Sequence, residues 1–217
     1  HTMGSMMTGG IIGGQIIYPI VDENWQVDES KKEMVLSETE KSGTHVSIHL
    51  GGYVVIGGEQ SALDILLKKL PTDDKYPFQL PFHAAFHTPL MHDVSATGMG
   101  TLPSSLFQKP SIPLVDGRGH IWSTFSTDIS ELHQYTLGHQ VTKAYDFTSA
   151  ITVAMKEFCP DKIVLLGPGN TLGGSIGQIM IENNWLDVNS KPTFSKRQKS
   201  DPYLISMGMD EQRQIVC

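Results

Sequence analysis

The chain has 217 residues, of which 39% are hydrophobic and 18% charged, a composition typical of a globular protein with a buried core. The net charge is −7, from 16 Lys and Arg against 23 Asp and Glu, which argues against nucleic-acid binding through clustered cations. No apolar segment approaches the ~20 residues that cross a bilayer. We therefore expect no nucleic-acid partner and no membrane partner.

The first 82 residues alternate between strand-like and helix-like patterns. The expected elements are a strand at 15–21, a helix at 28–42, strands at 45–50 and 53–56, a helix at 61–70 and a strand at 78–82. The pair Gly51 and Gly52 between two β-rich segments is a hairpin signal, and Leu63, Leu66 and Leu70 repeat at helical spacing. This order of elements predicts a ferredoxin-like α+β unit over residues 11–82.

The pattern changes from residue 83 onward. We expect a short strand at 112–115, helices at 129–140 and 147–158, a strand at 163–166 and a helix at 175–185. The polar tail after residue 189 has no clear pattern. Residues 83–217 are therefore predicted to form an α/β unit of another kind.

The two cysteines, Cys159 and Cys217, are too few for a disulfide scaffold and lack the spacing of metal ligands. Cys159 follows an apolar helical segment, so we expect its thiol to be buried. This use of cysteine fits a reducing compartment. Since the N-terminal residues also show no basic segment followed by an apolar one, we expect no secretion signal and a cytoplasmic location.

Residues 80–91 carry two histidines on an apolar segment that follows an expected strand. Catalytic side chains often lie where strands end and loops begin in α/β folds. His87 is our candidate for the base of an acyl-transfer reaction, with a hydrogen-bonded loop histidine as the alternative. For His83, a packing role competes with a functional one. The other histidines are too scattered for a metal site, so no metal is expected.

A nucleophile is harder to find. Residues 173–177 read Gly-Gly-Ser-Ile-Gly and match the G-x-S-x-G pattern. In a nucleophile elbow the serine sits on the turn between strand and helix, whereas Ser175 falls at or inside a predicted helix. We therefore expect Ser175 to serve helix packing or capping. The glycine-rich loop before it lacks the lysine of a phosphate-binding loop.

Four segments in this order point to a known family. They are Gly-Gly-Tyr-Val-Val-Ile-Gly-Gly-Glu at 51–59, Phe-His-Thr-Pro-Leu-Met at 86–91, Gly-His-Gln-Val-Thr at 138–142 and Leu-Gly-Pro-Gly-Asn-Thr-Leu at 166–172. In these segments the chain resembles malonyl-CoA:acyl carrier protein transacylases and the acyltransferase domains of fatty acid and polyketide synthases. The resemblance covers nearly the whole chain but only the C-terminal two-thirds of the family's domain. It implies the C-terminal part of an α/β-hydrolase-like core at 83–217, with the ferredoxin-like subdomain at 11–82.

The resemblance also implies a reaction. Such an enzyme moves a malonyl or similar small acyl group from CoA to the phosphopantetheine thiol of an acyl carrier protein, through an acyl-serine. Acyl-CoA and a carrier protein are then the partners, and no cofactor is needed beyond the thioester substrate. His87 matches the catalytic histidine, and Gln140 matches the residue whose backbone carbonyl orients that histidine in place of a carboxylate.

The resemblance extends to the acyl group and shows two departures. Ala84, Ala85 and Phe86 resemble the malonyl-selective motif, in which a bulky Phe86 crowds an α-branched acyl group, and we expect Phe86 and His83 to bind substrate. The family's serine, on an elbow upstream of the ferredoxin-like unit, has no counterpart, so we expect it to lie outside this chain. The family's malonate-binding arginine falls near Met3, which cannot pair with a carboxylate.

Two other functions remain open at this point. The chain is alternatively a non-catalytic module that docks a carrier protein. It is otherwise a serine hydrolase that uses Ser175 with His87, which requires the Ser175 Oγ within ~3 Å of an imidazole nitrogen or one water away from it.

Overall fold

A computed structural model describes residue 5 and residues 12–167 and 169–217. Met3 and residue 11, the expected first residue of the small subdomain, lie outside the described residues. No helix in these ranges is both long and apolar enough to cross a membrane.

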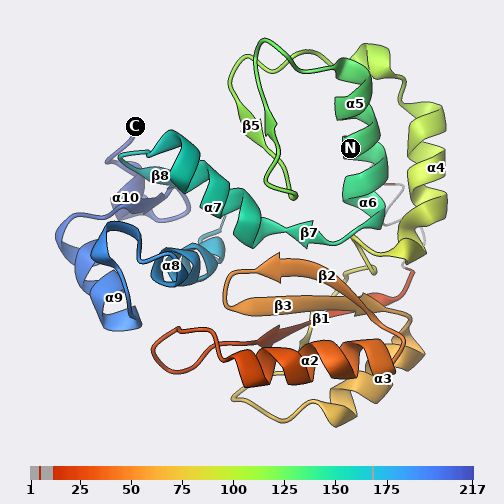
Figure 1. Cartoon of the computed structure of the whole chain (residues 1–217), viewed down its shortest axis with the longest axis horizontal. Helices are drawn as coiled ribbons and strands as arrows, with labels where there is room; N and C mark the ends of the chain where they lie inside the picture. Colours follow the sequence, from red (N-terminus) through yellow and green to blue (C-terminus); the bar gives the residue numbers. More distant parts are fainter. Residues whose placement is uncertain (1–4, 6–11, 168) are drawn as a thin grey trace.

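A five-stranded sheet organises the first half of the chain and recruits one strand from the second half (Figure 1). Its strand order is β4-β1-β3-β2-β7. The first four strands pair antiparallel, and β7 joins the edge strand β2 in parallel. The strands are β1 (Gly14–Pro19), β2 (His45–Leu50), β3 (Tyr53–Gly58), β4 (Phe78–Gln79) and β7 (Tyr145–Asp146). The order β4-β1-β3-β2 is that of a ferredoxin-like unit, and the hairpin at Gly51 and Gly52 is confirmed.

Two helices, α2 (Glu29–Lys41) and α3 (Gln60–Lys69), cover one face of this sheet (Figure 1). Helix α2 has few apolar residues, but it starts at a defined cap, because the Asp28 side chain accepts a hydrogen bond from the Lys31 amide. Helix α3 buries Leu63 and Leu66 completely against the sheet. Both predicted helices are therefore confirmed.

Strand β4 is shorter than predicted. It ends at Gln79, although the Leu80 amide still donates to the Gln15 carbonyl. Pro81 has no N–H group with which to continue the ladder, so the chain leaves the sheet there. The predicted division of the chain between residues 82 and 83 stays a prediction.

The middle of the chain forms helices and a hairpin beyond the β7 edge of the sheet (Figure 1). The elements are α4 (His92–Thr101), β5 (Leu114–Val115), β6 (Ile121–Trp122), α5 (Ile129–Gln134), a π-helical turn (Tyr135–His139) and α6 (Gln140–Thr142), with 3₁₀ turns at Pro89–Met91 and Ser104–Leu106. The strand expected at 112–115 is only two residues long. The helix expected at 129–140 is present, but its regular spacing is interrupted by the π turn.

The last third packs around a second core. It comprises α7 (Phe147–Phe158), β8 (Ile163–Leu165), α8 (Leu172–Glu182), a 3₁₀ turn (Trp185–Asp187), α9 (Lys191–Ser200), β9 (Leu204–Ser206) and α10 (Asp210–Arg213). Strands β8 and β9 pair in parallel, and Met155, Ile176 and Ile179 lie buried between the helices. The predicted α/β class is confirmed, and α7 has the predicted bounds.

One local prediction was wrong. Cys159 is exposed rather than buried. It lies just after the last residue of α7 and adopts a left-handed backbone with φ of 43°, so the chain turns away from the helix before the thiol can enter the core.

Candidate functional site

His87 lies on the loop that follows β4, and its ring is anchored by Gln140. The His87 Nδ1 atom lies 2.5 Å from the Gln140 backbone oxygen, across 53 residues of sequence. Because a carbonyl oxygen can only accept a hydrogen bond, Nδ1 carries the hydrogen, and in the neutral ring Nε2 keeps its lone pair. The structure thus brings together the two residues that the sequence singled out for catalysis.

Two buried polar side chains of the sheet fix the loop that carries His87. Ser47 donates a hydrogen bond of 2.6 Å to the Phe86 carbonyl, and Gln15 donates to the Ser47 Oγ at 2.6 Å and to the same carbonyl at 3.3 Å. The Gln15 side-chain oxygen also lies 2.8 Å from the His83 Nδ1. His87 itself has a φ of 57°, a conformation uncommon outside glycine. The loop backbone is therefore held against β1 and β2 with a definite geometry.

His87 lines a pocket of about 300 Å³ between α2, the start of β2 and the segment after α6. Glu40, His45 and Lys143 contribute ionisable groups to the same pocket. Phe86 does not line it; its ring packs beside the buried cluster of Ala84, Ala85, Met91 and Val141.

His83 also lies outside that pocket, with its ring 5.9 Å from the Phe86 ring. The structure thus places neither expected substrate-binding residue beside the His87 ring in this pocket. The substrate-binding roles of Phe86 and His83 stay predictions.

Burial controls the protonation of His87. Desolvation lowers the pKa of the His87 imidazole below its usual value, and the hydrogen bond to the Gln140 carbonyl partly opposes this shift. Desolvation also lowers the pKa of His83. At pH 7 the His87 ring is therefore neutral, with an available Nε2 lone pair, which is the state that a general base requires.

Tyr145 is a neighbour of His87 that the sequence did not indicate. Its ring centroid lies 5.6 Å from that of His87. The ring is held from behind by the turn between β5 and β6, where a side chain at Gly117 would place its Cβ 2.4 Å from the Tyr145 ring. The Gly117 amide donates to the Tyr135 hydroxyl at 2.8 Å. Nothing in the local pattern around residue 145 signals this arrangement, because it joins segments that are distant in sequence.

We expect Tyr145→Ala to raise the pKa of His87 toward the ordinary histidine value, because removal of the ring exposes the imidazole to water. Tyr145→Phe keeps the ring and serves as the matched control. Proton NMR titration of the histidine Cε1–H resonances measures both variants, with His83 as an internal reference. An unchanged His87 pKa in Tyr145→Ala would mean that Tyr145 does not desolvate the imidazole.

Ser175 lies far from His87. It is buried inside α8, and its backbone oxygen lies beside Gly51 at the hairpin end of β2. His87 shares its pocket with His45, at the opposite end of the same six-residue strand, which corresponds to a separation of roughly 20 Å. Within the described part of the chain, no hydrogen bond joins Ser175 to an imidazole. The geometry therefore supports a packing role for Ser175 and not a hydrolase site.

No group of three or more His, Cys, Asp or Glu side chains within the described ranges is arranged to hold a metal ion.

Comparisons with known proteins relate this geometry to a fold. No protein-family model matches the sequence. Over 136 residues, or 62% of this chain, the sequence is 27% identical to the polyketide biosynthesis acyltransferase homolog PksD of Bacillus subtilis (strain 168), of which the match covers 40%.

Solved structures give a broader match. The malonyl-CoA:acyl carrier protein transacylase FabD of Xanthomonas oryzae pv. oryzae superposes with a TM-score of 0.66 at 18% identity, covering 98% of this chain and 60% of that one. The malonyl-CoA:ACP transacylase of Synechocystis sp. PCC 6803 has a TM-score of 0.69 at 15% identity, with coverages of 99% and 62%. The chain thus has the fold of part of these transacylases and spans about 60% of their length. The predicted resemblance is confirmed at the level of fold.

Proposed function

We propose that this chain carries the histidine part of an acyltransferase that moves a malonyl or similar small acyl group from CoA to the phosphopantetheine thiol of an acyl carrier protein. The observation that supports it is the contact between the His87 Nδ1 and the Gln140 carbonyl, in a ring whose surroundings keep it neutral. The nucleophilic serine lies on a segment outside this chain. No cofactor takes part, and the protein acts in the cytoplasm.

The two half-reactions use one imidazole. In the first, the His87 Nε2 takes the proton of the serine hydroxyl as its oxygen attacks the thioester carbonyl, and the imidazolium returns that proton to the departing CoA sulfur. In the second, Nε2 takes the proton of the carrier thiol, whose sulfur attacks the acyl-serine, and then returns it to the serine oxygen. The Gln140 carbonyl holds the same tautomer throughout and stabilises the imidazolium.

The two units of the chain have separate parts in this proposal. Residues 11–82 form the ferredoxin-like subdomain, whose β1 and β2 hold the loop of His87. Residues 83–217 form the C-terminal part of the α/β-hydrolase-like core and supply both His87 and Gln140. A neutral carbonyl in place of a carboxylate avoids a buried charge beside the imidazole.

Trapping of a covalent intermediate tests the proposal. The full-length protein, mixed with malonyl-CoA and quenched in acid, is expected to gain one malonyl group on a serine, as measured by intact mass and peptide mapping. Addition of a carrier protein bearing its phosphopantetheine arm is expected to remove that group. If no serine is acylated by malonyl-CoA or by other small acyl-CoA thioesters, the proposal is wrong. Carrier affinity without transfer would instead indicate a docking module.

A further inference from the structure

A second pocket lies beside the helical segment that precedes Gln140. It has a volume of about 600 Å³ and lies between the β5–β6 hairpin and the helical segment from α5 through the π turn. The side chains that line it include those of Arg118, His120, Trp122, Glu131, Tyr135 and His139. We name this cavity the hairpin pocket. It shares no lining residue with the pocket of His87.

A buried carboxylate organises one wall of the hairpin pocket. The Asp116 side chain is 3% exposed and accepts hydrogen bonds from the Arg118 Nη2 at 2.6 Å, the Arg118 Nε at 3.1 Å and the Trp122 Nε1 at 3.1 Å. The backbone amides of Arg118 and His120 donate to it as well. Burial alone raises the pKa of Asp116, but these hydrogen bonds bring it below its usual value. The carboxylate therefore stays ionised and holds Arg118 in place.

Arg118 keeps unused hydrogen-bond donors. Its guanidinium lies over the Tyr135 ring at 4.3 Å, which fixes its plane. Two of its five N–H groups bind Asp116, which leaves three without a protein acceptor among the described residues. The side chain is 40% exposed. A fixed guanidinium with free donors is suited to bind a tetrahedral oxyanion.

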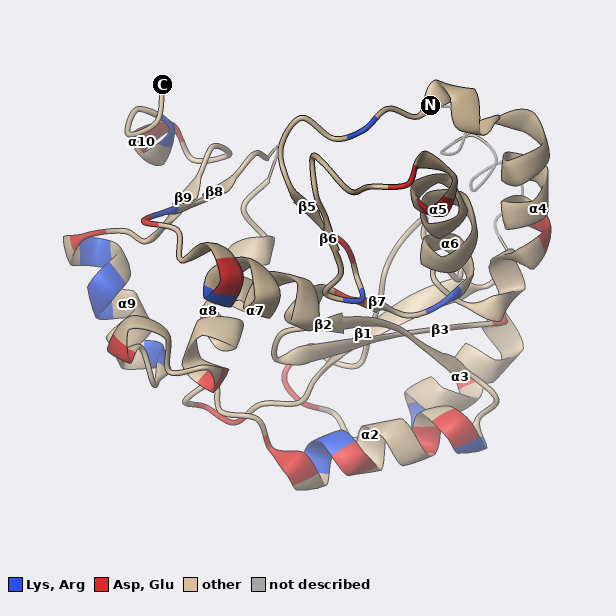
Figure 2. Cartoon of the chain, turned by 45° about the horizontal axis from the view of Figure 1, so that its top comes forward, with Lys and Arg blue, Asp and Glu red and all other residues tan. Residues whose placement is uncertain are grey.

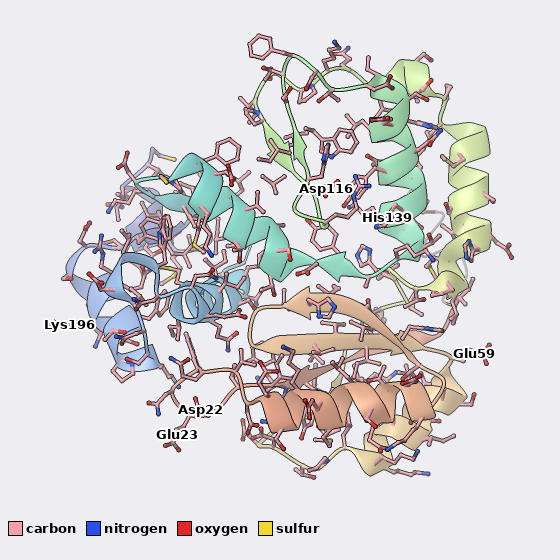
Figure 3. The ribbon with its side chains drawn as sticks, viewed as in Figure 1. Asp22, Glu23, Glu59, Asp116, His139 and Lys196 are labelled. Carbon is pink, nitrogen blue, oxygen red and sulfur yellow. The ribbon has the colours of Figure 1, made fainter. Side chains whose placement is uncertain are left out.

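Two imidazoles stand beside this guanidinium. The His120 ring packs edge-on to Trp122 at 4.5 Å, and the His139 ring stacks on Tyr135 at 5.7 Å. The π turn spans Tyr135 to His139, and Figure 3 shows Asp116 on the hairpin and His139 on the neighbouring helical segment. Neither imidazole has a hydrogen-bond partner within the described part of the protein. Each ring therefore has an N–H group that is available to donate to a ligand.

We propose that the hairpin pocket binds a phosphate group, with Arg118 as its fixed cation and His120 and His139 as additional donors. The site goes beyond the proposed transfer reaction and does not depend on it. Figure 2 shows that Lys and Arg also gather on α9. These residues are less suitable for binding a phosphate group. Arg197 is paired with Asp201, just past the end of that helix, and Lys196 is exposed on the surface of the helix.

The charges around His139 set the pH dependence of this site. Burial and the nearby Arg118 and Lys143 lower the pKa of His139, whereas Asp116 raises it. Glu131 and His120 line the same pocket. The Tyr135 hydroxyl oxygen accepts a hydrogen bond from the Gly117 amide. A bound dianion favours the protonated His139 imidazole, so its affinity rises as the pH falls, and the Glu131 carboxylate on the same pocket opposes binding of an anion.

Sulfate is the suitable first probe because its charge is constant from pH 5.5 to pH 8. Calorimetric titration of the whole chain is expected to show at least about fivefold tighter binding at the lower pH, with a raised His139 pKa in the NMR spectrum. Arg118→Met should weaken sulfate binding by about tenfold or more, whereas Arg118→Lys should retain part of it. Glu131→Gln should tighten binding, and Lys196→Met on α9 should leave it unchanged.

Three related ligands distinguish the source of the phosphate. If CoA binds more strongly than 3′-dephospho-CoA, the 3′-phosphate is the group that the pocket binds. If these two bind equally and pantetheine does not bind, the pocket binds the diphosphate. Equal binding of CoA and pantetheine assigns a free phosphate as the ligand instead. The proposal is overturned if Arg118→Met and Lys196→Met bind sulfate equally, or if sulfate leaves the His139 resonances unchanged. None of these measurements depends on acyl transfer, so a failure of this proposal can be distinguished from a failure of the proposed role of His87.

Discussion

His87→Asn is expected to lower the rate of acyl-serine formation in the full-length protein by at least about 10³-fold, because it removes the only proposed proton acceptor. Asparagine retains a donor for the Gln140 carbonyl, so the loop should keep its position. The experiment is a rapid-quench measurement of malonyl incorporation from malonyl-CoA, together with a thermal melt to confirm folding.

His92→Asn is the matched control for this prediction. His92 is exposed at the start of α4, only five positions along the chain, and its replacement should leave the rate within about twofold. Equal rates for His87→Asn and wild type would show that the imidazole does not transfer the proton. An equal loss of rate in His87→Asn and His92→Asn would instead indicate a general effect on folding.

Gly51→Ala is expected to destabilise the protein by about 3 kcal/mol or more, through two effects that add. Gly51 has a φ of 61°, which an L residue adopts only with strain, and the new Cβ would lie 2.5 Å from the Ser175 backbone oxygen. That oxygen belongs to α8, so the clash is with backbone and cannot be relieved by a side-chain rotation.

Gly43→Ala separates the two effects. Gly43 has a similar φ of 69°, but no atom lies within 4 Å of the position that an alanine Cβ would occupy there. The Gly43→Ala substitution should therefore lower the free energy of unfolding only by the strain of the left-handed backbone, about 1 kcal/mol. Urea unfolding measures the free energy of both variants, and a difference of roughly 2 kcal/mol is expected. Equal losses of unfolding free energy in Gly51→Ala and Gly43→Ala would mean that α8 does not pack on the hairpin as described.

Local patterns were sufficient for most of the fold. The alternation around Gly51 and Gly52 indicated the hairpin, and the leucine spacing of α3 indicated a helix that buries Leu63 and Leu66. The contact of His87 with Gln140 followed from the resemblance, since no local pattern joins residues so far apart. Its catalytic role stays a prediction.

Features that depend on tertiary contacts escaped prediction. The polar tail gave no sign of β9, because this strand is specified by its parallel pairing with β8. The π turn looked like ordinary helix, since the periodicity of residues 129–140 cannot show one extra residue in a turn. The network around Asp116 depends on the meeting of a hairpin with that turn. The burial expected for Cys159 was wrong because helix spacing does not report where the chain turns away.

The tautomer of His87 decides whether the Gln140 carbonyl holds its imidazole ready as a base. Long-range ¹H–¹⁵N NMR of the neutral ring distinguishes a protonated from an unprotonated ring nitrogen. We predict hydrogen on Nδ1 and a free Nε2, with a pKa below the ordinary histidine value. Hydrogen on Nε2, or an ordinary pKa with rapid exchange between tautomers, would contradict an imidazole held ready as a base by the Gln140 carbonyl.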